Sequence, residues 1–380
     1  MTLHNVAITD NGMPASLVIQ HGRITSIGPG QRDNAEQLFF DEAIVFPGII
    51  NSHDHLDFNL FPQLGNRHYR NYIEWATHIH THHKTAISQV LTIPESLRIQ
   101  WGIYKNLLCG VTTVVNHGKH IPYNNSPIDI FQQCHVLHSV QFEQGWKRKV
   151  NMTLKRRLPV AIHTGEGIDE LAHKEINELV HWNFAKRKLV GIHGVAMNEE
   201  QAANFHSLVW CPASNYYMFN TTAPVSRLKN HTHILFGSDS TLTSHWDIWQ
   251  HVRLARETGL LTDTELYHSM NASPAATWGL PNRGSISSGA TADIVIARKK
   301  TTDAMQAFFA TTPEDILLVV KNGMIILFDE SLLPQLRTIH PDDYSRIRLA
   351  ATSKFVYGNL PSLVREIQKY HTAVQLPVEI

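Results

Sequence analysis

The chain has 380 residues, of which 43% are apolar, and it carries 33 basic and 33 acidic residues, so its formal net charge is zero. This length and apolar content suit one large globular domain, or a large domain with a small one, and exclude a disordered chain. A neutral chain with no run of eighteen apolar residues also predicts no nucleic-acid partner and no membrane partner, and favours a small molecule instead.

The first 46 residues alternate short apolar runs with turn signals such as Asn11-Gly12 and His21-Gly22, which predicts a series of antiparallel hairpins. The same pattern returns in residues 284–300 and 317–329, where Asn322-Gly323 separates two apolar strands. Two β-rich pieces at opposite ends favour one small domain. We expect a composite β-sandwich built from residues 1–46 and 285–330.

Between these pieces, residues 47–284 alternate apolar strands with segments of helical periodicity, which is typical of a parallel sheet. Two helix starts, Asn198 with Gln201 and Thr262 with Glu265, have the spacing of a capping box. We predict an α/β fold with a (β/α)8 TIM-like barrel. Seven strands are visible, at residues 44–50, 111–115, 135–140, 158–163, 189–193, 207–212 and 233–239.

The eighth strand is expected between residues 140 and 159 as a short or distorted element, with residues 151–154 as its remnant. Residues 331–380 follow the second β-rich piece, and Leu363, Ile367 and Tyr370 there have helical spacing. We expect a C-terminal helical extension that serves only in packing.

Polar residues stand where the predicted parallel strands end. His53 and His55 follow the first strand, His163 and Glu166 a later one, His193 the next, and Asp239 the last. In a parallel barrel these ends meet on one face, and residues i and i+2 of a strand point to the same side. Three imidazoles and a carboxylate suit Zn²⁺ or Fe²⁺ with one position left for water.

Other histidines have a weaker case, because the chain contains 25 of them and a metal site uses only a few. His117 either lines the pocket or is a structural residue. The cluster of His78, His80, His82 and His83 falls within a solvated helix, so we interpret it as surface. The three cysteines, Cys109, Cys134 and Cys211, are odd in number and far apart, and no export signal is visible, which favours a reducing, cytoplasmic location.

The motifs along the chain resemble those of the amidohydrolase superfamily, within it the metal-dependent aminohydrolase group that includes guanine deaminase, cytosine deaminase and the triazine hydrolases. The resemblance covers residues 47–296 in the family's order. It rests on PGIINSHDHL (47–56), GVTTVV (110–115), HTGE (163–166), GIHG (191–194), WCPASN (210–215), FGSDS (236–240) and GSISSGATADIVI (284–296).

The resemblance implies a role for each matching residue. His53, His55 and His163 would bind the metal, with Asp239 as a further ligand and as base, while His193 would orient the attacking oxygen or polarise the substrate. Glu166 would shuttle protons. No lysine stands at a recognisable fourth-strand end, so we expect one divalent metal ion, with Zn²⁺ favoured over Fe²⁺.

These roles predict hydrolysis of a non-peptide C–N bond, with hydrolytic deamination of an amino-substituted N-heterocycle favoured. Alternatives are ring opening of a cyclic amide or imidazolone, and a catalytically inactive scaffold. A homodimer is compatible with the sequence. Candidate substrate contacts, which could instead pack against neighbouring helices, are Gln63, Arg67, Tyr69, Tyr72, Trp75, His117 and Asn215.

Overall fold

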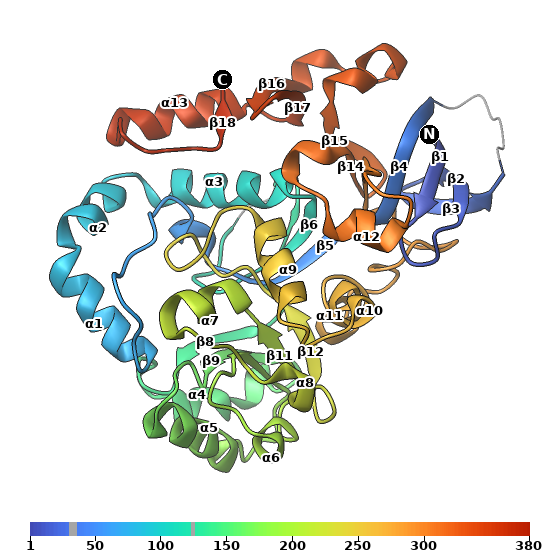
Figure 1. The fold of residues 1–380 in the computed structure, drawn as a ribbon. Coiled ribbons are helices and arrows are strands. Elements are labelled where there is room, and N and C mark those ends of the chain that lie inside the picture. The colour runs from blue at the N-terminus through green and yellow to red at the C-terminus, as the bar shows by residue number, and fades with distance from the viewer. Residues whose placement is uncertain (30–35, 123–125) are drawn as a thin grey trace.

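The protein has a mixed α/β fold, seen in a computed structural model that describes residues 1–29, 36–122 and 126–380. Parallel strands surrounded by helices form the larger part (Figure 1). A sheet made from both ends of the chain lies beside them, where the blue N-terminal strands and the orange C-terminal strands meet. Residues 30–35, within the expected small domain, lie outside the described residues.

Eight parallel strands position the polar residues of interest. They are arranged as a three-stranded sheet, β5-β6-β7, and a five-stranded sheet, β12-β11-β10-β9-β8. The main-chain N–H groups of Ser238 and Asp239 donate to the oxygen of His53 at 3.1 and 3.0 Å, which brings the end of β12 against the end of β5. The strands are β5 (Ile49–Asp54), β6 (Val111–Asn116), β7 (Asp129–Phe131), β8 (His135–Ser139), β9 (Val160–Thr164), β10 (Leu189–His193), β11 (Ser207–Trp210) and β12 (His233–Phe236).

The position expected for the eighth strand was wrong. The additional strand is β7, which comes before β8, and three residues are too few to show a periodicity in the sequence. Residues 151–154 instead form the connection after a short helix, α4 (Trp146–Val150), and the last two of them already belong to a 3-10 turn, η2 (Thr153–Lys155). Asn151 fixes this connection, because its side chain donates to the oxygen of Trp182 at 2.7 Å.

Helices follow most of these strands, and both predicted capping boxes are present at Asn198 and Thr262. α5 (Glu170–Trp182) begins after Asp169, whose side chain accepts from the N–H of Ala172, and it buries a face with helical spacing against β9. The remaining elements of this part are η1 (Leu56–Phe58), α1 (Tyr72–His82), α2 (Lys84–Leu91), α3 (Glu95–Leu108), α5 (Glu170–Trp182), α6 (Glu199–Ala202), α7 (Pro212–Phe219), α8 (Val225–Leu228), α9 (Ile248–Glu257), α10 (Asp263–His268) and α11 (Ala272–Trp278).

The second sheet combines strands from both ends of the chain, as predicted, because β4 pairs with β13. Its order is β18-β16-β17-β15-β14-β13-β4-β1-β2-β3. The hairpin prediction holds for β1 to β3 but not for β4, which pairs with β1 in parallel. The strands are β1 (Thr2–Ile8), β2 (Pro14–Gln20), β3 (Arg23–Gly28), β4 (Gln37–Pro47), β13 (Ile294–Arg298), β14 (Ile316–Lys321), β15 (Met324–Asp329), β16 (Tyr344–Leu349), β17 (Thr352–Tyr357) and β18 (Val378–Glu379).

The C-terminal extension is helical only in part. α13 (Leu360–Tyr370) packs on α3 and buries Leu363 and Ile367, whereas Tyr370 is exposed. The other regular elements of the extension are β16, β17 and β18, which continue the composite sheet, and short 3-10 turns. The remaining short elements are α12 (Ala304–Phe309), η3 (Pro313–Asp315), η4 (Glu330–Gln335) and η5 (Pro341–Asp343). Among the helices of the described ranges, none has the length and apolar content needed to cross a bilayer.

Candidate active site

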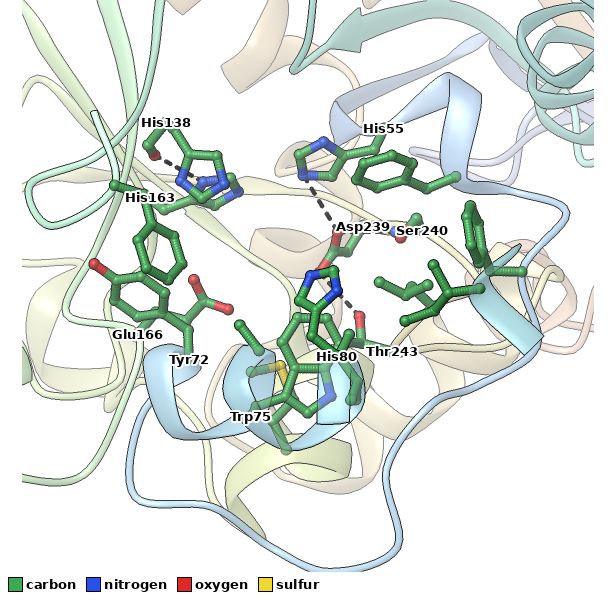
Figure 2. Close-up of a pocket in the computed structure, with 18 of the residues that line it drawn as sticks. His55, Tyr72, Trp75, His80, His138, His163, Glu166, Asp239, Ser240 and Thr243 are labelled. Atoms are coloured by element: carbon green, nitrogen blue, oxygen red, sulfur yellow. Dashed lines mark hydrogen bonds and ion pairs between the residues drawn. The ribbon is translucent and has the colours of Figure 1, made fainter. Parts of the chain in front are cut away.

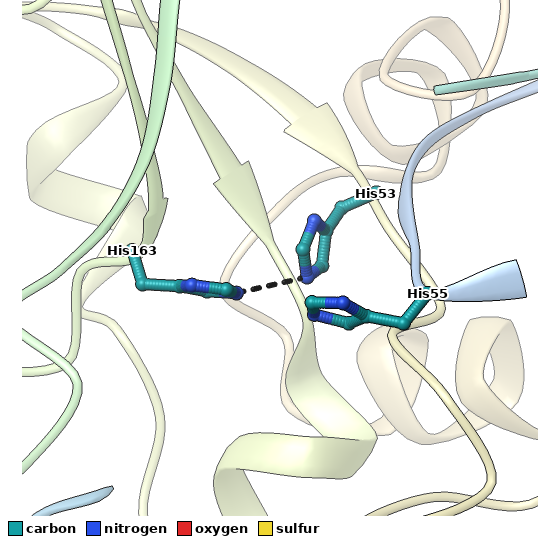
Figure 3. A group of neighbouring side chains, drawn as sticks. All are labelled: His53, His55 and His163. Carbon is teal, nitrogen blue, oxygen red and sulfur yellow. Dashed lines mark hydrogen bonds between the residues drawn. The ribbon is translucent and has the colours of Figure 1, made fainter. Parts of the chain in front are cut away.

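Three histidines and one aspartate meet at the carboxyl ends of the parallel strands. His53 and His55 come from the end of β5, and His163 comes from β9. The Nε2 atoms of His53 and His163 lie 3.3 Å apart (Figure 3). Oδ1 of Asp239, after β12, lies 3.6 Å from Nε2 of His53 and 3.8 Å from Nε2 of His55. His53 and Asp239, which lie near opposite ends of the parallel-strand region in the sequence, thus point at the same position in space.

These spacings fit a divalent metal ion. Four ligands placed at ~2.0–2.1 Å in a tetrahedron lie roughly 3.3 Å from one another, and the donor atoms of His53, His55 and His163 all lie within 4.8 Å of one another. The imidazoles of His55 and His163 are also in the neutral form that binds metal. Burial is the main factor that lowers the pKa of His55 to about 3 and that of His163 well below its ordinary value, with neighbouring histidines adding to the effect.

Hydrogen bonds select the ring nitrogen that faces this position. Nδ1 of His163 lies 2.8 Å from the main-chain oxygen of His138. A carbonyl oxygen only accepts, so Nδ1 carries the proton and Nε2 keeps its lone pair. In the same way Nδ1 of His193 donates to Oδ1 of Asn215 at 2.9 Å. Burial lowers the pKa of His193 to about 4, so this ring is neutral near pH 7 with Nε2 as an acceptor.

Asp239 is held by groups on two neighbouring segments. Its Oδ2 accepts from the hydroxyls of Ser214 (2.7 Å) and Thr243 (3.1 Å), and its Oδ1 accepts from the N–H of Ser240 (2.8 Å). Burial alone would raise the pKa of Asp239. The hydrogen bond and charge interaction with His53, together with the other nearby histidines, instead hold this pKa well below its ordinary value. The carboxylate is therefore ionised and its orientation is fixed.

The backbone is strained where the site is assembled. His193 and Asp239 have φ angles of +72° and +54°, a conformation that non-glycine residues adopt at a cost of about 1–3 kcal/mol. Gly237 permits the close approach of β12, because a Cβ at that position would lie 2.9 Å from Cβ of His53 and 2.8 Å from a methyl group of Val209. A larger residue would displace the very strand end that carries Asp239.

Glu166 faces the same position from the loop after β9. Its Oε1 lies 3.6 Å from Nε2 of His193. Burial raises the pKa of Glu166 well above its ordinary value, and the charges of Asp239 and Glu175 add to this. Glu175, on α5, accepts from the N–H of Gly165 at 2.9 Å and from the hydroxyl of Tyr72 at 3.1 Å, and so fixes the loop. A carboxyl group that holds its proton near neutral pH can act as a general acid.

The site opens into a cavity of about 370 Å³ whose walls are largely apolar and aromatic (Figure 2). α1 and α2 supply Tyr72, Trp75, Ile79 and Leu91, and no lysine or arginine of the described ranges lines the cavity. Most of the polar groups come from the strand ends and the loops that follow them, namely His55, His138, His163, Glu166, His193, Asp239, Ser240 and Thr243, whereas His80 comes from α1. This distribution suits a flat, uncharged ring that presents one polar edge to the candidate metal ligands.

A second cavity of about 820 Å³ lies against the outer side of His55 and His138. His117 lines this cavity and not the first one. Its ring packs 4.3 Å from that of His163 and 5.1 Å from that of His53, measured between centroids. Its Nε2 is buried without a hydrogen-bond partner among the described residues. His117 thus belongs to the histidine cluster but does not line the cavity into which the candidate metal ligands open.

The proposed substrate contacts separate into two groups. Tyr72 and Trp75 line the central cavity. Gln63 lines a different cavity with Trp246 and His371, whereas Arg67 is exposed and pairs with Glu74 at 3.1 Å. Asn215 is buried beneath His193, where it fixes the ring, and Tyr69 is buried with its hydroxyl near the N–H of Asn66. Gln63, Arg67, Tyr69 and Asn215 therefore do not line the cavity that holds the metal ligands.

Two histidines of the cavity were not recognised from the sequence. His80 is exposed, as expected for its helix, yet it also lines the cavity from α1. His138 lines both cavities from the end of β8. The signal for His138 was its place at a strand end. The same reasoning cannot identify His80, because the position of α1 over the strand ends depends on tertiary packing.

Asp54, between His53 and His55, points away from the candidate metal ligands. Its carboxylate accepts from Lys105 Nζ (2.9 Å), Asn106 Nδ2 (2.8 Å) and Asn59 Nδ2 (2.7 Å). Asp54 and Lys105 are both fully buried. This ion pair joins β5 to α3 and fixes the segment from which both histidines project.

The family model described as the amidohydrolase family matches residues 135–327. That span is half of the chain, and the chain belongs to this family of hydrolytic enzymes. No curated protein sequence matches the chain.

Several solved structures share the fold at low sequence identity. An adenosine deaminase from Xanthomonas campestris with bound zinc is 14% identical, covers 98% of both chains and has a TM-score of 0.73. Atrazine chlorohydrolase from Arthrobacter aurescens in complex with zinc is 14% identical over 97% of this chain and 99% of its own, with a TM-score of 0.68. Guanine deaminase from C. acetobutylicum, with bound guanine, is 15% identical over 85% and 98%, with a TM-score of 0.63.

Proposed function

We propose that the protein is a metal-dependent aminohydrolase that removes an amino group from an N-heterocycle by hydrolysis. The observation that carries this proposal is the position of Glu166, a buried carboxyl group beside His193, in the same cavity as three histidines and Asp239. The zinc-containing deaminase and chlorohydrolase structures with this fold support it. Ring substrates also suit the flat, apolar walls of the cavity.

His53, His55, His163 and Asp239 would hold one divalent ion, with zinc favoured by three nitrogen ligands and one oxygen ligand. Such an ion, when bound, makes water a nucleophile at neutral pH by lowering its pKa from 15.7 toward ~7. The neutral rings of His55 and His163 and the ionised Asp239 are ready to act as ligands without first losing a proton.

Two carboxyl groups with opposite protonation states divide the proton transfers. Asp239, which is ionised, accepts a proton from the attacking water. Glu166, which is protonated, donates to a ring nitrogen next to the amino-bearing carbon, and this makes that carbon more electrophilic. When the C–N bond breaks, Asp239 passes the water proton to the departing amine, Glu166 recovers a proton from the hydroxyl of the adduct, and ammonia leaves. His193 is fixed by Asn215, so its Nε2 can accept a hydrogen bond from the water or the adduct.

The proposal also covers how the strands and domains are arranged around the site. We propose that β5 to β12 close into a (β/α)8 barrel over residues 47–284, because His53 already accepts hydrogen bonds from the end of β12. Residues 1–46 and 285–330 then form the small β domain. The extension after residue 330 widens its sheet through β16 to β18.

The direct test is ammonia release by the zinc-loaded protein from a panel of aminopurines, aminopyrimidines and aminopterins. Glu166→Gln should reduce turnover of any substrate found by about 10²–10⁴-fold while the metal content stays unchanged. Glu170→Gln, an exposed carboxylate on α5, is the matched control. Retained turnover in Glu166→Gln would overturn the role of this residue. Loss of ring absorbance without ammonia would replace deamination by ring opening.

A further inference from the structure

We propose that the amino-terminal end of the parallel strands, on the side opposite the metal ligands, binds the surface of an anionic phospholipid membrane. This surface, called the basic face below, contains three groups of three consecutive cations. They are Lys147 to Lys149 on α4, Lys155 to Arg157 before β9, and Lys186 to Lys188 before β10. The zero net charge of the chain conceals this local accumulation, because acidic residues elsewhere balance it.

Hydrogen bonds join the three groups into one surface. The Arg187 guanidinium donates to the main-chain oxygens of Val150 (3.1 Å) and Leu158 (2.7 Å). Oδ1 of Asn151 accepts from the N–H of Ala185 at 2.9 Å. The segment around α4 and η2 is therefore held against the end of α5, which lies next to α4 in Figure 1.

Most of these cations lack a counter-charge. Lys149 pairs with Glu143, and Arg187 is buried against carbonyl oxygens. The other seven are exposed, and none of them forms an ion pair with a carboxylate of residues 1–29, 36–122 or 126–380. They are Lys147, Arg148, Lys155, Arg156, Arg157, Lys186 and Lys188. An unpaired cluster of this size produces a local positive potential that attracts anionic surfaces.

Two apolar side chains project from the same face. Leu154 is 94% exposed and directly precedes one basic group, and Phe184 is 65% exposed and lies two residues before another. Exposed aliphatic and aromatic groups surrounded by lysine and arginine are typical of proteins that insert a few side chains into the boundary between headgroups and acyl chains. An exposed leucine would gain nothing from contact with phosphate groups alone, whereas it can insert between lipid chains.

The aromatic groups of the basic face favour a membrane over a single-stranded nucleic acid. Nucleic acids bind through bases that stack on free aromatic rings. Here the Nζ atom of Lys147 lies 4.2 Å from the centroid of the Trp182 ring, and the Phe184 ring packs 5.3 Å from it. The indole is therefore already occupied by side chains of the protein.

The location leaves the active site accessible. β9 and β10 each begin shortly after a basic group, and they carry His163 and His193 at or next to their last residue. Five residues of strand separate the two ends by roughly 15 Å. A membrane bound to the basic face would not cover the opening of the central cavity, so a substrate could enter from water while the enzyme stays on the surface.

The test is cosedimentation of the full-length protein with vesicles of phosphatidylcholine alone or mixed with phosphatidylglycerol. We expect a bound fraction that rises more than tenfold with the anionic lipid and falls as salt is added. Combined Lys155→Glu, Arg156→Glu and Arg157→Glu substitutions should abolish it. Lys84→Glu, Arg337→Glu and Arg365→Glu, three exposed cations on other surfaces, change the net charge equally and should preserve binding.

Combined Leu154→Ser and Phe184→Ser substitutions should weaken the part of vesicle binding that persists at high salt. Circular dichroism of each variant establishes that it is folded. No binding of the unmodified protein to anionic vesicles at low salt would overturn the proposal, as would equal loss of binding in both triple variants. Binding of single-stranded RNA without binding of vesicles would replace the membrane by a nucleic acid.

Discussion

The two ends of the same parallel strands differ in how their charges are placed. At the carboxyl ends, most of the polar groups are buried and several are oriented by a hydrogen-bond partner, as Asn215 orients His193 and Ser214 orients Asp239. At the amino ends, seven cations are exposed without a carboxylate partner among the described residues. A buried charge without a well-placed partner destabilises the folded state strongly, so the positions of charged groups at the carboxyl ends are tightly constrained. Exposed charges are solvated, so their positions at the amino ends matter little to stability. Mutations at the two ends should therefore differ in kind as well as in size.

The largest effect is expected at the proposed metal ligands. His163→Ala removes one of three imidazoles that converge within 4.8 Å and should reduce metal affinity by more than about a hundredfold. Metal per chain after dialysis, determined by plasma mass spectrometry, measures this. His138→Ala is the control, because His163 bonds to the main-chain oxygen of His138 and not to its ring. Equal metal content in both variants would contradict the proposed ligand set.

The next effect concerns the support beneath these ligands. Lys105→Met leaves the carboxylate of Asp54 buried without its cation and should lower the free energy of unfolding by about 3–5 kcal/mol. Urea denaturation measures the change. Lys119→Met removes an exposed ion pair with Glu95 and should cost less than about 1 kcal/mol. Similar losses in the two variants would show that burial of the Asp54 pair has no special effect.

A smaller, pH-dependent effect is expected at Glu175. Burial raises its pKa to about 7 in the folded protein, above the ordinary 4.5. The folded state therefore holds this proton more tightly, and the stabilisation it gives below pH 4.5 is lost as pH rises toward 7. Glu175→Gln removes this loss, and its amide oxygen can still accept from the N–H of Gly165, while its NH2 group donates to the Tyr72 hydroxyl that the carboxylate accepted from. Relative to the unmodified protein, it should be equally stable near pH 4 and more stable by up to about 3 kcal/mol near pH 8.

Denaturation curves collected across this range would test the assignment. A constant difference between the two proteins at all pH values would contradict it, because a purely steric effect of the substitution does not depend on protonation.

The sequence predicted the residues that meet in space but not the residues that orient them. His53, His55, His163 and Asp239 could be found because strand ends in a parallel sheet converge, whatever the length of chain between them. The contact of Asn215 with His193 depends on a side-chain direction in α7, and the position of α1 over the cavity depends on packing. Neither has a periodic signal. β7 was missed because a strand of three residues has almost no period to detect.

The smallest effect is expected at the basic face, and its sign opposes that at the carboxyl ends. Reversing Lys155, Arg156 and Arg157 removes repulsion among exposed like charges and breaks no ion pair of the described chain. The variant should be more stable than the unmodified protein by a few tenths of a kcal/mol at low salt. Added salt should erase the difference, because it screens the repulsion in the unmodified protein. Thermal denaturation at two salt concentrations measures this. A loss of stability that persists at high salt would instead show that these side chains make short-range contacts that hold the loop before β9.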